Sequence, residues 1–198
     1  MSGPVIVDTG GANIASLQLA VERLGRTAEL SADPQRIERG SHVFLPGVGA
    51  AADAMTRLER TGLAEVIPRL TQPVLGICLG MQLLYEASEE GETRCLGVLP
   101  GRVRRMSPAP GRPVPHMGWN RVAHGRPHAL LEGLEDGGFA YFVHSYRAPL
   151  GEDTLAACDY GETFTAIASR GNFHGVQFHP ERSAALGSRF LANFLELP

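Results

Sequence analysis

An alternation of short apolar runs, glycine-containing turns and helix-like stretches in the first half of the chain most constrains its fold. The runs have the length and composition of buried strands, and the stretches between them repeat apolar residues with helical spacing. The strand candidates are residues 4–8, 27–30, 42–45 and 74–77, and the helix candidates are residues 14–24, 51–58 and 79–87. A polar loop is expected around Asp33. This order is typical of an open, largely parallel sheet flanked by helices.

The second half of the chain follows a different pattern. Its strand candidates are close-spaced, with little room for helices between them, and they lie at residues 139–143, 154–157, 164–168 and 173–178. Such spacing is typical of antiparallel strands, and a final helix is predicted over residues 183–195. Residues 97–125 are rich in glycine, proline and arginine. We therefore expect a single α/β domain over residues 1–198, a length that suits one well-filled domain, with an antiparallel extension of the parallel sheet.

Composition and charge argue against several classes of protein. The formal net charge is −3 and the densest basic cluster is the short stretch 102–105, so nucleic acid is not expected as a partner. The cysteines Cys78, Cys95 and Cys158 form no C-x-x-C pair, which fits a reducing compartment. No run approaches the roughly 18 to 20 apolar residues of a membrane span, and the N-terminus lacks the basic region of a signal peptide. We expect a cytoplasmic protein without membrane contact.

Cys78 lies between two near-adjacent glycines in Gly76-Ile-Cys-Leu-Gly80, at the junction of a predicted strand and a predicted helix. Gly-x-Cys-x-Gly at such a junction resembles a nucleophile elbow, a sharp and strained turn that lifts the nucleophile clear of the backbone. The helix N-terminus behind the sulfur favours the thiolate. The pentapeptide alone is equally compatible with a small buried hydrophobic residue, which is the commonest role of cysteine.

A thiol nucleophile needs a base, and His179-Pro180-Glu181 follows the last strand candidate. Because proline disfavours a helical conformation of the preceding residue, His179 is expected to be extended. Residues two apart in an extended segment share a face, so the carboxylate of Glu181 can orient the imidazole and stabilise its charged form. A His-Pro-Glu sequence by itself is more often a surface turn, and the elbow cysteine in the same chain reverses that balance.

The third requirement is a pair of donors for the oxyanion that forms when a carbonyl is attacked. Gly47-Val48-Gly49 ends another predicted parallel strand, and its glycines leave backbone N–H groups accessible. The N–H of Leu79, the residue after the nucleophile, supplies a second donor. A glycine-rich turn is more often only a turn, but its position at a strand end, on the side expected for the elbow, supports this assignment.

No metal and no cofactor are expected. The loop at residues 8–13 lacks the G-x-G-x-x-G of dinucleotide-binding turns, and the seven histidines include no H-E-x-x-H. Neither His124 with His128 nor His174 with His179 has carboxylate or cysteine company at ligand spacing.

With cysteine, histidine and glutamate in this order, the chain resembles the class I glutamine amidotransferases. More narrowly, it closely resembles the glutaminase subunits of imidazole glycerol phosphate synthases, enzymes of histidine biosynthesis. The motifs that carry the resemblance are LPGVGA at residues 45–50, PVLGICLGMQLLYEASEEG at 73–91, PHMGWN at 115–120, YFVHSY at 141–146 and GVQFHPERS at 175–183. PHMGWN together with YFVHSY points to this group of subunits, whereas the other motifs occur in varied form in other amidotransferases. A flavodoxin-like fold is implied.

The resemblance implies that the chain hydrolyses glutamine to glutamate and ammonia through a γ-glutamyl thioester. By position in the motifs, Cys78 is the nucleophile, His179 the general base and acid, and Glu181 the residue that orients it. The other implied site residues are Gly47, Val48, Gly49 and Leu79 around the oxyanion, and Gln82, Ser145 and Tyr146 around the bound glutamine.

The resemblance also implies a protein partner. The family's partner is a (β/α)₈-barrel cyclase, bound as a one-to-one heterodimer, which takes ammonia through its centre and makes imidazole glycerol phosphate and an aminoimidazole carboxamide ribotide. The glutaminase motifs of this chain run from residue 45 to 183 and leave no room for a synthase domain. The positions that match the family's interface are Asn13, Trp119, Tyr141 and Arg182, although both aromatic residues would equally suit a core.

Two other classes of function stay open from the sequence. A stand-alone cysteine hydrolase or peptidase of similar open-sheet fold has the same elbow and histidine but acts without a partner. A silent regulatory subunit keeps the fold and the interface and lacks a member of the triad, whereas all three members are present here. The departures from the family pattern are Thr9, where an aromatic residue is usual, and Arg182, where lysine is frequent.

Overall fold

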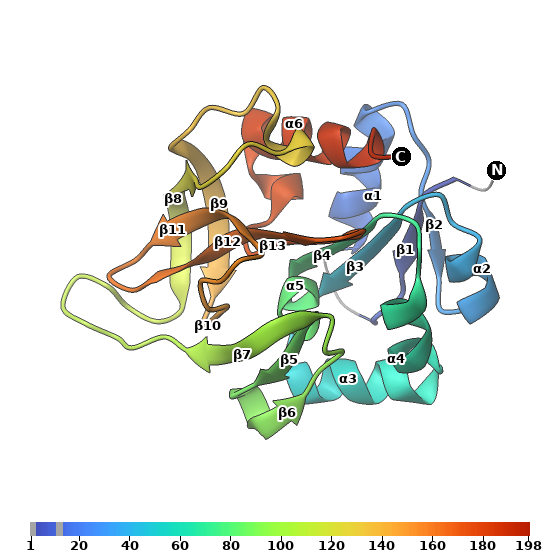
Figure 1. Ribbon diagram of the computed structural model, residues 1–198, viewed down its shortest axis with the longest axis horizontal. Helices are drawn as coiled ribbons and strands as arrows, with labels where there is room; N and C mark the ends of the chain where they lie inside the picture. Colours follow the sequence, from blue (N-terminus) through green and yellow to red (C-terminus); the bar gives the residue numbers. More distant parts are fainter. Residues whose placement is uncertain (1–2, 11–13) are drawn as a thin grey trace.

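The computed structural model describes residues 3–10 and 14–198, and Figure 1 shows their arrangement as an α/β fold with two sheets. The central sheet has the order β2-β1-β3-β4-β13-β12-β11-β8-β9, and a smaller sheet has the order β10-β7-β5-β6. The strands of the central sheet are β1 (Val5–Val7), β2 (Glu29–Ser31), β3 (Val43–Gly47), β4 (Val74–Cys78), β8 (His116–His124), β9 (Gly138–His144), β11 (Thr154–Asp159), β12 (Thr163–Arg170) and β13 (Phe173–Val176). The smaller sheet consists of β5 (Tyr85–Ser88), β6 (Thr93–Arg94), β7 (Leu99–Arg105) and β10 (Tyr146–Arg147).

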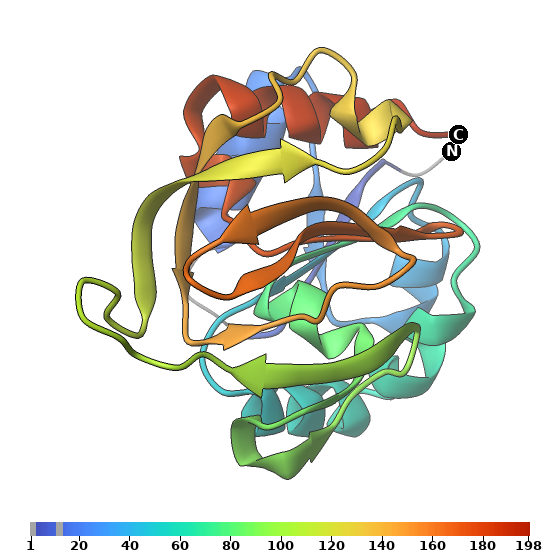
Figure 2. The same cartoon turned by 60° about the vertical axis from the view of Figure 1, so that its left-hand side comes forward.

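Helices cover both faces of the central sheet. The helices are α1 (Ile14–Arg23), α2 (Pro34–Glu38), α3 (Ala51–Arg60), α4 (Leu63–Val66), α5 (Leu79–Leu83) and α6 (Ala184–Leu195), with 3₁₀ turns η1 (Ile67–Arg69), η2 (Glu90–Glu92), η3 (Ala129–Leu131) and η4 (Pro180–Arg182). Figures 1 and 2 show α1 and α6 on one face and α3, α4 and the smaller sheet on the other. In β3, Phe44 packs under α1 and α6, whereas Val43 and Leu45 pack toward α3 and α4. Burial on both faces explains the continuous apolar runs of the parallel strands.

The parallel and antiparallel halves of the central sheet meet at β13. This strand is parallel to β4, with Val176 opposite Ile77, and antiparallel to β12, with Val176 opposite Ile167. The α/β prediction with a parallel sheet and an antiparallel extension is confirmed, although the last predicted strand is antiparallel on one side only. Because β3, β4 and β13 are parallel neighbours, the residues that follow them emerge at one edge of the sheet.

The predicted helix over residues 79–87 is wrong in its second half. α5 ends at Leu83, and Tyr85–Ser88 form β5, which pairs in parallel with β7 and antiparallel with β6. Tyr85 is buried, with 4% of its surface exposed. Pairing with the two strands that follow it therefore overrides a local sequence that favours helix.

Two strands lie in the glycine- and arginine-rich region for which no element was predicted. In β7 the buried side chains are Leu99 and Val103, and the arginines between and after them are exposed. In β8 the buried side chains are His116 and Val122. So few apolar residues give a weak alternation signal.

A short helix replaces the polar loop that was expected near Asp33. α2 begins at Pro34, and the side chain of Asp33 accepts a hydrogen bond from the backbone N–H of Gln35. This is the usual chemistry of a helix N-cap followed by proline.

Within residues 3–10 and 14–198 every helix is too short or too polar to cross a membrane.

Candidate active site

Cys78 lies at the sharp turn between β4 and α5. Its φ of 54° and ψ of −110° lie outside the regions that residues with a Cβ favour, so the turn is strained. A Cβ on Gly80 would lie 1.8 Å from the carbonyl oxygen of Leu45, and one on Gly76 would lie 2.7 Å from that of Gly80. The glycines therefore permit the elbow by letting α5 pack tightly against the strands, while Cys78 itself takes the strained conformation.

The imidazole of His179 connects Cys78 with Glu181. Its Nδ1 lies 2.8 Å from Oε1 of Glu181, and the ring also hydrogen-bonds the sulfur of Cys78. Burial by itself lowers the pKa of His179, but the hydrogen bonds to Cys78 and Glu181, and the charges of both groups, outweigh burial and raise the pKa to about 10. Both partners of the ring thus favour its protonated form.

Glu181 reaches the imidazole by a different backbone path from the one predicted. His179 is extended, with φ of −94° and ψ of 100°, but Pro180–Arg182 form the 3₁₀ turn η4. The backbone N–H of His179 donates to Tyr141 O at 3.0 Å, and Ser183 Oγ donates to His179 O at 2.7 Å. The two side chains meet as expected, and a pinned turn rather than a continuing strand brings them together.

A cavity of about 390 Å³ opens in front of the sulfur. Its lining includes Gly47, Val48, Gly49, Cys78, Leu79, Gln82, Glu90, Pro115, Val143, His144, Ser145, Tyr146 and His179. The residues predicted for the oxyanion and for glutamine therefore face one space, whose volume is in the range of small-molecule sites. Gly49 has a φ of 88°, a conformation that glycine adopts readily.

Gln82 is more enclosed than a residue that only binds substrate. It is 4% exposed, and its Nε2 donates to Tyr146 O at 3.0 Å and to Gln177 Oε1 at 2.9 Å. Both N–H groups of its amide thus have protein partners. Contact with a substrate is left to its Oε1.

Two histidines lie beside Tyr146, one of the residues predicted to bind the substrate. His144 Nδ1 lies 2.8 Å from Tyr146 O, and His116 Nδ1 lies 3.0 Å from His144 Nε2. Burial lowers the pKa of His144 to about 3 and that of His116 to about 4. Both rings are therefore neutral at pH 7 and act as hydrogen-bonding groups in the wall of the cavity.

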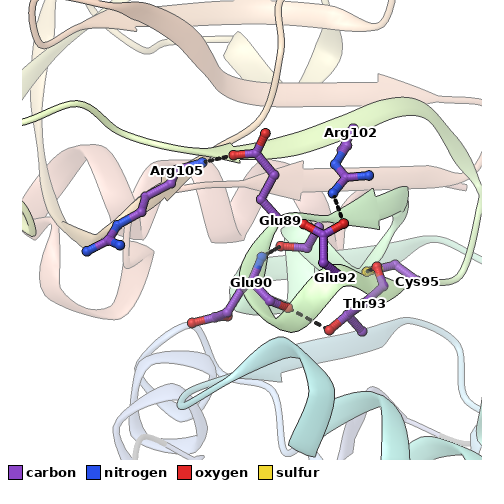
Figure 3. Close-up of polar contacts among 8 residues, drawn as sticks. Glu89, Glu90, Glu92, Thr93, Cys95, Arg102 and Arg105 are labelled. Atoms are coloured by element: carbon purple, nitrogen blue, oxygen red, sulfur yellow. Dashed lines mark hydrogen bonds and ion pairs between the residues drawn. The ribbon is translucent and has the colours of Figure 1, made fainter.

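Glu90 lines the cavity and was missed by the sequence analysis. It begins the turn η2 in the smaller sheet, where Thr93 Oγ1 donates to Glu90 O at 2.6 Å and Glu90 N donates to Ser88 Oγ at 3.1 Å. Its Oε2 accepts the backbone N–H of Ala51 at 2.8 Å. Figure 3 shows this turn, in which Glu89 and Glu92 contact Arg105 and Arg102. A carboxylate in the middle of an acidic run gives no local sequence signal of a binding role.

The predicted interface residues in the described part of the chain lie on or near the outer side of β8 and β9. Trp119 is 52% exposed and contacts Tyr141 edge to face, with 5.9 Å between ring centroids. The guanidinium of Arg182 lies 5.9 Å from the centroid of the Tyr141 ring. Trp119 is thus not a core aromatic residue. Asn13 lies outside the described residues.

Thr9 is buried, and its Oγ1 donates to Pro46 O at 3.3 Å, which ties the segment after β1 to the end of β3. Within residues 3–10 and 14–198, no group of three or more His, Cys, Asp or Glu side chains is placed to hold a metal ion.

Comparison with known proteins places this site in a family. A family model described as "Glutamine amidotransferase class-I" matches residues 5–197. "Imidazole glycerol phosphate synthase subunit HisH" of Xanthomonas axonopodis pv. citri (strain 306) is 53% identical over 197 residues, which cover 100% of this chain and 98% of the relative. The protein of the same name from Xanthomonas campestris pv. campestris (strain 8004) is 54% identical over the same shares of both chains.

Solved structures share the fold at lower identity. A crystal structure of a glutamine amidotransferase superimposes with a TM-score of 0.75 at 22% identity and covers 97% of each chain. PurLQS from Thermotoga maritima gives a TM-score of 0.68 at 17% identity, over 98% of this chain and 97% of that one. The two relatives named above, matched over the whole length of this chain, are HisH subunits of imidazole glycerol phosphate synthase, and the chain belongs to the class-I glutamine amidotransferase family.

Proposed function

We propose that this chain is the glutaminase subunit of an imidazole glycerol phosphate synthase. The observation that carries the proposal is a strained Cys78, hydrogen-bonded to an imidazole that Glu181 orients, at the wall of a cavity of about 390 Å³. The names of its full-length relatives support the assignment to this synthase.

In the proposed reaction the thiolate of Cys78 attacks the γ-carboxamide carbon of glutamine. The backbone N–H of Leu79 and one N–H of the Gly47–Gly49 turn stabilise the oxyanion. His179 gives its proton to the nitrogen of the tetrahedral intermediate, ammonia leaves, and a γ-glutamyl thioester remains. His179 then accepts a proton from water, whose attack on the thioester releases glutamate and regenerates the thiolate.

Ser145, Tyr146 and Gln82 are proposed to hold the α-amino and carboxylate groups of glutamine, and Glu90 adds a negative charge for the ammonium. Its Oε2 accepts from Ala51, which orients the carboxylate. We therefore expect Glu90→Gln to raise KM for glutamine about 10- to 100-fold with kcat changed only a few-fold, because a charged hydrogen bond contributes about 1.5–3 kcal/mol. Steady-state glutamate release measures both constants.

Glu89→Gln is the matched control, because Glu89 accepts from Arg105 N and does not line the cavity. Its KM should equal that of the wild type. An unchanged KM in Glu90→Gln would remove Glu90 from the substrate site.

The proposed partner is a (β/α)₈-barrel cyclase in a one-to-one heterodimer, which receives ammonia and makes imidazole glycerol phosphate and an aminoimidazole carboxamide ribotide. The exposed Trp119, with Tyr141 and Arg182 beside it, supports docking on the outer side of β8 and β9. The three cysteines are buried and free, which fits the reducing cytoplasm that we propose as its location.

The test of the proposed function is glutamine hydrolysis by the purified chain alone, with its cognate cyclase, and with cyclase plus the acceptor nucleotide. We expect slow turnover alone and an increase of about 10²- to 10³-fold in the complete complex. This is the effect of gaining one oxyanion donor when the peptide unit between Val48 and Gly49 rotates. Equal turnover in all three mixtures would favour a stand-alone hydrolase, and none in any mixture would favour a silent subunit.

A further inference from the structure

A buried amide approaches the nucleophile from the core side. Gln177 follows β13, two residues before His179, and none of its surface is exposed. Its backbone N–H donates to Ala166 O at 2.9 Å. Its side-chain Nε2 lies 3.7 Å from Cys78 Sγ, and its Oε1 lies 2.9 Å from Gln82 Nε2. Gln177 does not line the cavity, so its contact with the sulfur is separate from those that a substrate would make.

The direction of this contact follows from the acceptors around it. Tyr146 O is a backbone carbonyl and accepts only, so the group of Gln82 that lies 3.0 Å from it is the amide nitrogen. The second N–H of Gln82 is directed at Gln177, which must therefore present its oxygen there and its nitrogen to the sulfur. A flipped Gln177 amide would set two donors against each other and direct its carbonyl oxygen at Cys78.

The groups around the sulfur make the Gln177 amide important for stabilising the thiolate of Cys78. Val143 O lies 3.7 Å from Cys78 Sγ, where it can accept from a thiol but repels a thiolate. The helix behind the sulfur, α5, has only five residues, so its dipole favours the thiolate less than the longer predicted helix would. In a buried site, an N–H group directed at the sulfur offsets the repulsion between the thiolate and the carbonyl oxygen of Val143.

We propose that Gln177 is a positioning residue that donates a hydrogen bond to the thiolate of Cys78, held in place by Gln82 and the carbonyl of Tyr146. Within the proposed glutaminase function, on which this role rests, the donor acts twice. It stabilises the thiolate before attack, and it stabilises the same thiolate when it leaves the thioester during hydrolysis.

The test is alkylation of Cys78 by iodoacetamide, followed by mass spectrometry of the folded full chain between pH 5 and 10. In Gln177→Met we expect the rate on the acid side of the pH profile to fall about 5- to 10-fold. The midpoint of the pH profile should move upward by about 0.7 to 1 pH unit, because one neutral donor to the charged form is lost. The rates should converge within about two-fold at the alkaline plateau.

The other cysteines are internal controls. Burial and the nearby Glu90 raise the pKa of Cys95 to about 11, and burial and Asp159 raise that of Cys158 to about 12, so neither competes at pH 7. Gln82→Met removes the partner that orients the Gln177 amide but keeps the amide itself, so its pH profile should move in the same direction as that of Gln177→Met and by less.

If Gln177→Met does not fold, the double variant Gln82→Met/Gln177→Met replaces both amides with apolar groups of similar shape and should give the same shift. A profile that superimposes on the wild type would overturn the proposal. So would a rate lowered equally at every pH, which indicates changed access to the sulfur. Alkylation needs no glutamine, so either result would leave the proposed glutaminase function standing.

Discussion

Replacing Cys78 with alanine should abolish glutamine hydrolysis, with a loss of about 10⁴-fold or more in kcat, because no thioester can form. Alanine keeps the Cβ that the strained backbone already accommodates, so the fold should persist. In the complex with the proposed cyclase, synthesis supplied with ammonium salts at high pH should continue, since only the ammonia source is lost. Glutamate release and product formation with ammonium measure the two activities separately.

Cys95→Ala and Cys158→Ala are the controls for this prediction. Both thiols are buried outside the cavity, so the two variants should hydrolyse glutamine at close to the wild-type rate. Glutamine turnover by Cys78→Ala at the wild-type rate would make Cys78 a structural residue and the proposed mechanism wrong.

The second large effect on kcat is expected for His179, the proposed general base. His179→Asn should lower kcat by several orders of magnitude, because neither proton transfer has another group to carry it. Glu181→Gln should cost less, since an amide oxygen can still accept from Nδ1 at the observed 2.8 Å position. Measuring kcat for both variants in the assembled complex tests this order.

The pH dependence of glutamine hydrolysis further distinguishes the role of His179 from that of Glu181. Burial lowers the pKa of His179, but its partners Cys78 and Glu181 raise that pKa, to a net value of about 10. Removing the Glu181 carboxylate should therefore lower the pKa of His179. The alkaline limb of activity should therefore appear at lower pH in Glu181→Gln than in the wild type. An alkaline limb at unchanged pH, or equal kcat for His179→Asn and the wild type, would contradict the proposed triad.

Cys78 and His179, which meet at the strand ends, were predictable because each lies in a short, recognisable sequence pattern. A cysteine between glycines at a strand end, and a histidine fixed by the following proline, can each be recognised within a few residues. Parallel strands then place the ends of β3, β4 and β13 side by side, with Gly47 opposite Cys78 in the register. The α/β fold followed from the same alternation.

The elements that were missed depend on partners far away in the sequence. Tyr85–Ser88 is a strand only because β7 lies beside it, and β7 itself carries exposed arginines that hide its alternation. Glu90 reaches the cavity through that smaller sheet, and Gln177 reaches the sulfur through the packing of β13 against β4. No local pattern encodes either contact, because each depends on which strands become neighbours.

The place of β13 has a consequence for how the chain is made. The strand comes late in the sequence but lies in the middle of the central sheet, between β4 and β12. On the ribosome, Cys78 and its strained turn therefore emerge long before the segment that carries the histidine. A nascent or prematurely ended chain that stops before Phe173 holds the proposed nucleophile without the proposed base, and its central sheet lacks β13. By the proposed mechanism, only a chain synthesised past its final strand can consume glutamine, so unfinished copies do not drain the cell's supply.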